Sequence, residues 1–527
     1  MSLFEFIESD LLLKWISKEI GPMQASDLDR IGQENVTKAI FGNSLLKSRS
    51  RFVDFLLSCD DEKFDALCAR LNVSQRQRKR LDVAIEIASK PFTVKSALAA
   101  SARDIFSIDD CFMPITEAST ETESLIEPAS SLPPAYDYQL ELVEEIKLFL
   151  RSDQLATLVQ LPTGSGKTRV ALQSIVEHLT VGGMEKNTFV WLAHTQELCQ
   201  QAYETFRRMW VASGNEPIKV YCLWGGRKAT LKTSQPTAVF STFGTFSAMY
   251  ERDELQGVID RLQCVFIDEA HRASSRVFGG FVKRLKKNVK VIGLTATPGR
   301  QVDADMDNVE LKQLFESRLI SSSILGDDPI NELQDRGILG VPKIEFIVGS
   351  DTEIFTSETG DIGSGTLNVL AQDDERNQVI INELIRLAGL DEKILVFSCS
   401  VAHSKLLVAN LACRGVSSAY VDSEMSAGRR MSIIENFSRG ENNVLINFGI
   451  LSTGFDVPDI SAVVITRPTT SIVLYSQMLG RGMRGPSAGG SEDFIVLDIR
   501  DNIDSFGQVN EVYNYFQSLW QGGSKFH

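Results

Sequence analysis

Residues 156–168 constrain the fold of this chain more than any other segment. The run ATLVQL is apolar, which predicts a buried strand, and PTGSGKT follows it directly, ahead of a helix-like pattern. Glycines in such a loop let backbone N–H groups converge on a phosphate, and the N-terminus of the next helix adds partial positive charge. The stricter form of this pattern has glycine where this chain has Leu161, so a looser variant must be accepted. The order of strand, loop and helix predicts a phosphate-binding α/β lobe.

A second signature follows the apolar residues 265–267, where Asp268 and Glu269 precede Ala270 and His271. A strand that ends there places both carboxylates at the carboxyl edge of a sheet, where α/β folds hold their ligands. Asp268 is expected to hold Mg²⁺, and Glu269 to orient and deprotonate an attacking water. An isolated Asp-Glu pair is more often a solvated acidic loop. The two signatures in this order favour the functional interpretation.

Short apolar runs alternate with helix-like segments along two stretches of the chain, which predicts two tandem α/β lobes with parallel sheets. In the first lobe, strands are expected at 156–161, 188–193, 238–242, 264–267 and 289–294. In the second lobe, they are expected at 393–397, 417–421, 444–447, 462–466 and 494–497.

The chain is expected to divide into six parts. Residues 1–113 carry helix-period patterns and predict a helical accessory module, and 114–134 contain no Lys or Arg and have the composition of a linker. The other parts are lobe 1 at 135–301, an inter-lobe connection at 302–371, lobe 2 at 372–510 and a C-terminal tail at 511–527. The basic stretch 76–80 lines a nucleic-acid path or forms a solvated helix face, and the face is favoured.

The composition excludes some classes of protein. No apolar run approaches the roughly 18 residues of a membrane span, and the first residues read as an amphipathic helix rather than a cleavable signal. The eight cysteines are scattered with no C-x-x-C pair, which predicts a reducing, cytoplasmic setting and no zinc ribbon. The net charge of −15 decides little, because a local row of phosphate contacts is enough to bind nucleic acid.

Taken with LTATP at 294–298, GSGKT and DEAH resemble the first lobe of the DEAH-type superfamily-2 helicases. The second half has similar marks in ILVFS at 394–398, GFDVP at 454–458 and QMLGRGMR at 477–484, the last resembling the family's Q-x-x-G-R-x-x-R motif. The resemblance covers about 134–505. On residues 329–339 and 496–503 it is closest to the restriction-enzyme and repair or transcription translocases. It implies two RecA-like lobes that use ATP and Mg²⁺ to act on a nucleic acid.

The resemblance also implies site residues. The expected catalytic residues are Lys167, Glu269, Gln477, Arg481 and Arg484. Those expected to bind ATP are Gln139, Thr163, Gly164, Ser165, Gly166, Lys167, Thr168, Asp268, Gly454 and Asp456, with Thr168 and Asp268 also holding Mg²⁺. Those expected to contact nucleic acid are His194, Thr195, Thr242, Ser400 and Thr453. The chemistry of Arg481 and Arg484 suits this role. A guanidinium that reaches across from the opposite lobe can neutralise the charge that develops on the γ-phosphate.

Some of these residues have a plainer interpretation. Thr195 and Thr242 follow strands, so they can simply cap the next helices. Thr453 and Asp456 can likewise cap a turn. His271 has no other histidine at metal-ligand spacing and is expected to couple the ATP site to the strand-gripping surface rather than to bind a metal.

The expected function is an ATP-dependent translocase or helicase, with DNA favoured over RNA as substrate and no membrane partner. Two alternatives remain open. One is an RNA helicase or remodeller; the other is a nucleotide-switched scaffold or sensor that docks a protein partner through its N-terminal module. The chain shows no long strand-separating insertion, nuclease-like carboxylate cluster or methyltransferase motif. Translocation or duplex remodelling is therefore a safer expectation than processive unwinding.

Overall fold

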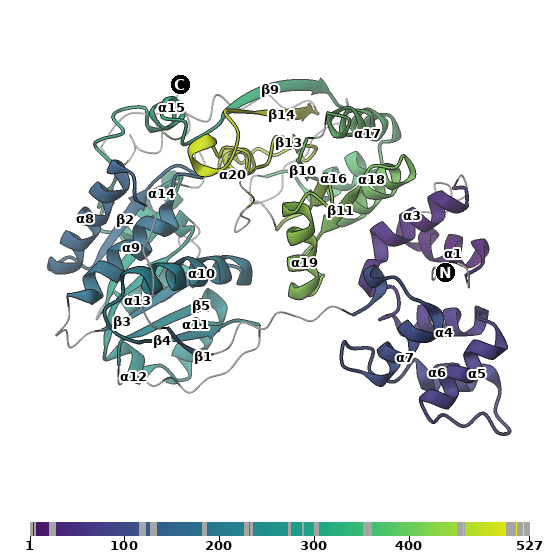
Figure 1. Ribbon diagram of the computed structural model, residues 1–527. Helices are drawn as coiled ribbons and strands as arrows, with labels where there is room; N and C mark the ends of the chain where they lie inside the picture. The colour runs from purple at the N-terminus through teal and green to yellow at the C-terminus, as the bar shows by residue number, and fades with distance from the viewer. Residues whose placement is uncertain are drawn as a thin grey trace.

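Two lobes built on parallel sheets and an N-terminal group of helices make up the protein (Figure 1), which confirms the predicted fold class. The computed structural model describes residues 4, 7–20, 28–114, 123–126, 134–181, 187–225, 231, 235–271, 276–286, 289–299, 305–350, 361–390, 392–450, 457, 459–501, 513 and 520. Within this part of the chain, no helix is both long and apolar enough to cross a membrane.

Lobe 1 is an eight-stranded sheet in the order β1-β4-β5-β3-β6-β7-β2-β8. Its strands are β1 (Glu123–Ile126), β2 (Ala156–Gln160), β3 (Thr188–Ala193), β4 (Ile218–Leu223), β5 (Thr237–Thr242), β6 (Leu262–Ile267), β7 (Lys290–Thr295) and β8 (Leu319–Ile320). Neighbouring strands are parallel except at the β1–β4 edge. The helices are α8 (Asp137–Arg151), α9 (Lys167–Thr180), α10 (Gln196–Ser213), α11 (Phe243–Glu251), α12 (Gln256–Ile259), α13 (Arg276–Leu285) and α14 (Asp305–Leu314).

Successive side chains of β3 point to opposite faces of the sheet, and helices cover both faces. Phe189 and Trp191 pack into one core cluster with residues of α8, α9 and α10, whereas Val190 and Leu192 pack into another with residues of α11, α13 and α14. The strand is buried along its whole length, as expected for a parallel strand with helices on both faces.

Lobe 2 is a six-stranded parallel sheet in the order β11-β12-β10-β13-β14-β9. Its strands are β9 (Val341–Val348), β10 (Ile394–Phe397), β11 (Ser418–Val421), β12 (Val444–Asn447), β13 (Ala462–Ile465) and β14 (Asp493–Arg500). Its helices are α16 (Ser364–Ala371), α17 (Asp374–Ala388), α18 (Val401–Cys413), α19 (Ala427–Ser438) and α20 (Ile472–Leu479).

Every strand expected from the sequence is present, with boundaries that differ by three residues at most. The strands that the sequence analysis missed are β1, β4, β8 and β9. The stretch 302–371 was expected to be only a connection, yet it supplies β8 to the first sheet and β9 to the second. The crossing between lobes therefore lies between Ile320 and Val341 and includes the short helix α15 (Pro329–Asp335). The expected linker 114–134 likewise adds β1 at the edge of lobe 1.

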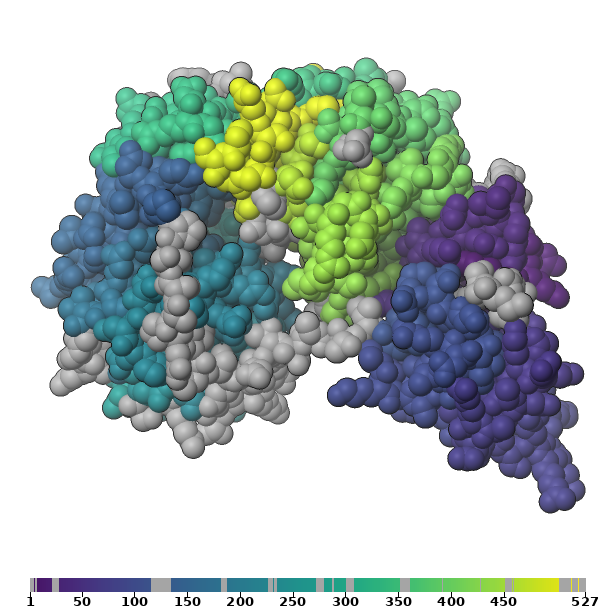
Figure 2. Space-filling view, in the orientation of Figure 1, coloured from purple at the N-terminus to yellow at the C-terminus, as the bar shows by residue number. Residues whose placement is uncertain are grey.

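Two of the N-terminal helices, α1 and α3, pack against α18 of lobe 2, and Figures 1 and 2 show this module beside the lobe-2 surface. The helices of the module are α1 (Ser9–Ile20), α3 (Arg30–Phe41), α4 (Arg49–Ser58), α5 (Asp61–Arg70), α6 (Arg80–Ile87) and α7 (Ala97–Phe106). Their apolar core continues into Ala409 and Ala412 of α18. The guanidinium of Arg429 in α19 donates to the Ile40 carbonyl at 3.0 Å. The module is therefore attached to lobe 2 through α1 and α3.

Candidate functional site: a cleft between the two lobes

The loop after β2 has the backbone of a phosphate cradle. Gly164 and Gly166 have φ values of +86° and +94°, which residues with a Cβ rarely adopt. A Cβ at Gly166 would also lie 2.6 Å from Nε2 of Gln139. The Ser165 hydroxyl donates to the Pro162 carbonyl at 2.7 Å and closes the turn. The loop then enters α9, which begins at Lys167 and has Thr168 in its first turn.

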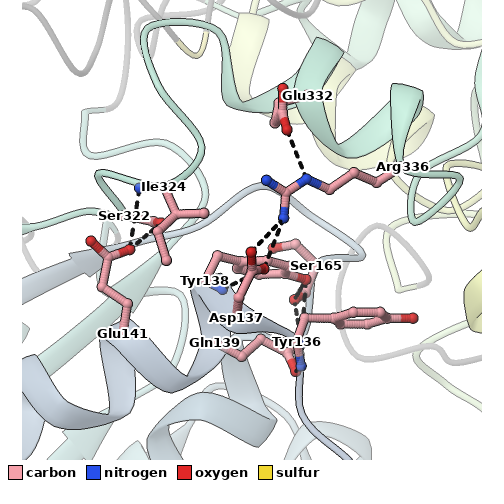
Figure 3. A network of polar contacts seen from close by, with 10 residues as sticks. All are labelled: Tyr136, Asp137, Tyr138, Gln139, Glu141, Ser165, Ser322, Ile324, Glu332 and Arg336. Carbon is pink, nitrogen blue, oxygen red and sulfur yellow. Dashed lines mark hydrogen bonds and ion pairs between the residues drawn. The ribbon is translucent and has the colours of Figure 1, made fainter.

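Side chains in the first turn of α8 hydrogen-bond to the phosphate loop after β2 (Figure 3). The Tyr138 hydroxyl and the Gln139 amide both donate to the Ser165 carbonyl, at 2.8 and 3.0 Å. Oε1 of Gln139 accepts from the Tyr136 backbone N–H at 3.2 Å. The Gln139 amide thus contacts protein through both its nitrogen and its oxygen, and its binding of ATP stays a prediction.

Lys167 lies close to the acidic end of β6. Burial lowers the pKa of Lys167, and the charges of Glu269 and Asp268 oppose that shift. Arg481 of lobe 2 is also within electrostatic reach of Lys167 and lowers its pKa further. The structure therefore brings together the lysine, both carboxylates and one of the arginines that the sequence analysis selected.

The acidic pair is buried. Asp268 is 5% exposed and Glu269 is 9% exposed, and the Glu269 N–H donates to Asp268 Oδ1 at 3.0 Å. Burial raises the pKa of Asp268, the charge of Glu269 raises it further, and Lys167 opposes both. Glu269 also has a φ of +51°, a backbone conformation that is uncommon for residues other than glycine and clusters at functional sites. Two buried carboxylates that repel one another are a suitable setting for a divalent cation.

His271 links the acidic pair to its surroundings. Its Nδ1 lies 3.3 Å from Glu269 Oε2 and 3.2 Å from Thr295 Oγ1. Its Nε2 lies 3.4 Å from the amide nitrogen of Gln477 in lobe 2. The Thr295 hydroxyl in turn donates to the Thr297 carbonyl at 2.8 Å. One imidazole thus contacts the acidic pair, the end of β7 and the opposite lobe.

The arginine segment 477–484 lies against the phosphate loop. A Cβ at Gly480 would lie 2.5 Å from Cγ2 of Thr163, so the close approach of the lobes requires glycine there. Arg481 affects the pKa values of both Lys167 and Asp268. Arg484 forms an antiparallel bridge with Leu339 at the end of the inter-lobe crossing.

Residues predicted to contact nucleic acid lie at the carboxyl ends of strands. Thr195 caps α10 by accepting from the Leu198 N–H at 3.3 Å, and Thr242 caps α11 by accepting from the Thr245 N–H at 3.4 Å. Ala193, just before His194 and Thr195, pairs with Thr242 across β3 and β5. Ser400 caps α18. The capping interpretation of the two threonines is therefore realised, and phosphate contact by His194, Thr195, Thr242 and Ser400 stays a prediction. Thr453, Gly454 and Asp456 lie outside the described residues.

Two further contacts across the molecule were missed from the sequence. Glu197 of α10 and Arg430 of α19 form an inter-lobe ion pair in which Nε donates to Oε1 at 2.9 Å. Tyr513 is buried and lines a small pocket between the two lobes, together with Pro162, Thr163, Thr297, Ser476 and Met483. The sequence gives no signal for either contact. Glu197 is an acidic residue in the first turn of a helix, and Tyr513 is an aromatic residue in a polar tail.

The comparisons with known proteins agree with this architecture. The family model described as type III restriction enzyme, res subunit, matches residues 133–300, and the helicase conserved C-terminal domain matches 375–485. The structure of Saccharomyces cerevisiae Dbp5 bound to RNA and ADP BeF3 superposes with a TM-score of 0.51 at 17% identity, covering 72% of this chain and 92% of that one. This likeness confirms the RecA-like fold.

Two curated relatives are similar along the lobes. The putative ATP-dependent helicase IRC3 of Saccharomyces cerevisiae is 25% identical over 371 residues, which are 68% of this chain and 51% of that protein. The ATP-dependent RNA helicase DBP3 of Yarrowia lipolytica is 24% identical over 336 residues, which are 62% of this chain and 56% of that protein. The chain spans about half the length of these relatives. Because the two family models together match just over half of the chain and fall on the two lobes in order, the chain belongs to the superfamily-2 helicases and is related to the restriction-enzyme group.

Proposed function

We propose that this protein is a nucleic-acid-stimulated ATPase that translocates on or remodels DNA. The observation that carries the proposal is that Lys167, the Asp268–Glu269 pair and Arg481 of lobe 2 lie within electrostatic reach of one another. A phosphate cradle, a carboxylate pair and an arginine from the opposite lobe are the parts that phosphoryl transfer to water requires. A nucleotide-switched scaffold needs the cradle alone.

In the proposed mechanism, the backbone of the 163–166 loop and Lys167 bind the phosphates. Thr168 and Asp268 would hold Mg²⁺, which would supply charge neutralisation on the phosphate oxygens. Glu269 orients the attacking water and takes its proton. Arg481 and Arg484 approach from lobe 2 as the cleft closes and neutralise charge on the γ-phosphate.

Nucleic acid is proposed to lie across the carboxyl ends of β3, β5 and β10, near Thr195, Thr242 and Ser400. A strand that contacts both lobes favours their closed arrangement, so by linkage it stimulates turnover. We favour DNA because the lobe-1 family model is that of a restriction-enzyme subunit. The likeness to DBP3 keeps an RNA helicase as the second candidate. All eight cysteines are free, which supports a reducing compartment such as the cytoplasm.

The test is an ATPase assay of the full chain with single-stranded DNA, duplex DNA, RNA or no polymer. We expect turnover to rise at least about tenfold with DNA and less with RNA, because the polymer stabilises the closed lobes. Preferential stimulation by RNA would support the second candidate. Turnover that responds to no polymer would contradict a nucleic-acid motor and favour the scaffold.

A further inference from the structure

The start of α8 contacts three parts of the machinery at once, and Figure 3 shows its contacts with the phosphate loop and with the inter-lobe crossing. It holds the phosphate loop through the Ser165 carbonyl, as described above. The Tyr136 hydroxyl donates to the Ser487 carbonyl of lobe 2 at 3.2 Å. Asp137 and Glu141, one helical turn apart, both face the inter-lobe crossing. This turn is therefore the place where loop, crossing and lobe 2 meet.

Glu141 fixes the beginning of the crossing. Its carboxylate accepts from the backbone N–H groups of Ser323 and Ile324 at 3.0 and 3.4 Å, and from the hydroxyls of Ser322 and Ser323. Burial acts to raise the pKa of Glu141, but these hydrogen bonds outweigh it and the net pKa is lowered. A carboxylate with several donors holds the start of the crossing against lobe 1.

Asp137 fixes the far end of α15. Nη1 of Arg336 donates to both carboxylate oxygens of Asp137, at 2.8 and 3.0 Å, and Nε donates to Glu332 at 2.7 Å. The side chains of Arg336 and Asp137 are 30% and 57% exposed. An ion pair this exposed contributes little to global stability, but it can decide between two arrangements of similar energy.

Directly after Arg336, the chain pairs with residues 483–487 of lobe 2, where the arginine segment ends. The backbone N–H groups of Ser487 and Gly485 donate to the carbonyls of Gly337 and Ile338, each at 3.0 Å, and the Gly340 N–H donates to Met483 at 3.0 Å. This ladder contains the Leu339–Arg484 bridge. The position of the arginine segment is thus set partly by a piece of chain that Asp137 holds against lobe 1.

We propose that the Asp137–Arg336 ion pair is a clasp that positions residues 483–487, and with them the arginine segment 477–484, over the phosphate loop. Arg336 acts through that segment and is a positioning residue, not a catalytic one. The effect on turnover rests on the proposed ATPase function, whereas the effect on the ladder does not. Because α8 also holds the Ser165 carbonyl, the clasp joins the nucleotide-binding loop and the arginines through one helical turn.

The test compares Arg336→Ala with a matched control, Arg386→Ala. Arg386 is also exposed and also bonded to two carboxylates, Glu383 at 2.6 Å and Glu345 at 3.0 Å, but all three lie within lobe 2. We expect Arg336→Ala to lower the nucleic-acid-stimulated kcat roughly three- to tenfold, with KM for ATP changed less than about twofold and Tm no lower than in the control. Arg336→Lys, which keeps the charge but loses the two-oxygen contact, is expected to fall between wild type and Arg336→Ala.

A second readout needs no turnover. Hydrogen exchange at the backbone amides of Gly485 and Ser487 is expected to speed up severalfold in Arg336→Ala and to stay unchanged in Arg386→Ala. Unchanged exchange in Arg336→Ala, or an equal loss of kcat in the Arg386→Ala control, overturns the clasp. A wild-type protein without ATPase activity overturns the proposed function instead, and the exchange measurement still decides the clasp.

Discussion

Nε2 of His271 in lobe 1 lies 3.4 Å from the amide nitrogen of Gln477 in lobe 2. The amide can donate to Nε2 only when the ring proton is on Nδ1, the atom that faces Glu269 and Thr295. Through His271, a lobe-2 side chain is therefore linked to Glu269, the proposed water-activating carboxylate. Separation of the lobes therefore alters the environment of Glu269.

This contact predicts non-additive mutations. His271→Ala and Gln477→Ala are each expected to lower stimulated kcat about tenfold or more, because each removes the same link between the lobes. The double variant is expected to lose little more than either single one, with a coupling of about 1 kcal/mol or more in a double-mutant cycle. Losses that simply multiply would show that the two side chains act separately.

Substitutions at Glu269 and Lys167 are expected to separate ATP binding from ATP hydrolysis. Glu269→Gln is expected to reduce ATP turnover by about a hundredfold or more, because the amide cannot take a proton from water, while ATP still binds. Lys167→Ala is expected to weaken ATP binding as well, since it removes the cation that faces the phosphates. Nucleotide titration and single-turnover assays check both, and wild-type hydrolysis in either variant contradicts the proposed site.

Tyr513, in the C-terminal tail after β14, is expected to contribute to the stability of the protein. It is 4% exposed and lines a small pocket between the lobes together with Thr163, Thr297 and Met483. Tyr513→Ala is expected to lower the free energy of unfolding by about 3 kcal/mol, because it leaves a cavity where the two lobes meet. Tyr513→Phe keeps the ring and is expected to match wild type in thermal denaturation. Equal Tm values for wild type and Tyr513→Ala would contradict this packing.

His403 predicts a loss of stability in acid. Its Nδ1 accepts from the Cys399 N–H at 3.2 Å and its Nε2 lies 3.0 Å from Asn377 Oδ1, so both nitrogens are bonded when the ring is neutral. Burial, with a smaller effect of Arg376, lowers the pKa of His403 from 6.5 to about 3. The unfolded chain takes up the proton first, so stability is present above the unfolded pKa and is lost as pH falls below it.

The expected loss from His403 is about 2 kcal/mol on going from about pH 7.5 to pH 5. Denaturant unfolding of wild type and His403→Gln at both pH values checks it. The variant is expected to have the shallower pH dependence. His178, whose pKa burial lowers to about 4, accounts for part of the slope that remains.

The sequence alone predicted the local units of this protein. The strand, loop and helix around Lys167 and the apolar strand ending in Asp268 are encoded within windows of a few residues, where periodicity and glycine placement reflect the backbone directly. The strands β10–β14 of lobe 2 were predicted from short apolar runs in the same way, and the motifs in both lobes identified the family. β9 was missed because most of its residues are exposed and lack the apolar run of a buried strand.

Only the tertiary structure decided which of these units face one another. The sequence does not indicate that the N-terminal module packs on α18, that Glu197 meets Arg430, or that Asp137 holds Arg336. Partners of this kind are separated by up to several hundred residues, and each pair is a single contact with no periodicity to detect. They arise because each folded sheet brings loops that are distant in sequence to the same edge, and packing of the two lobes then determines which side chains are close enough to bond.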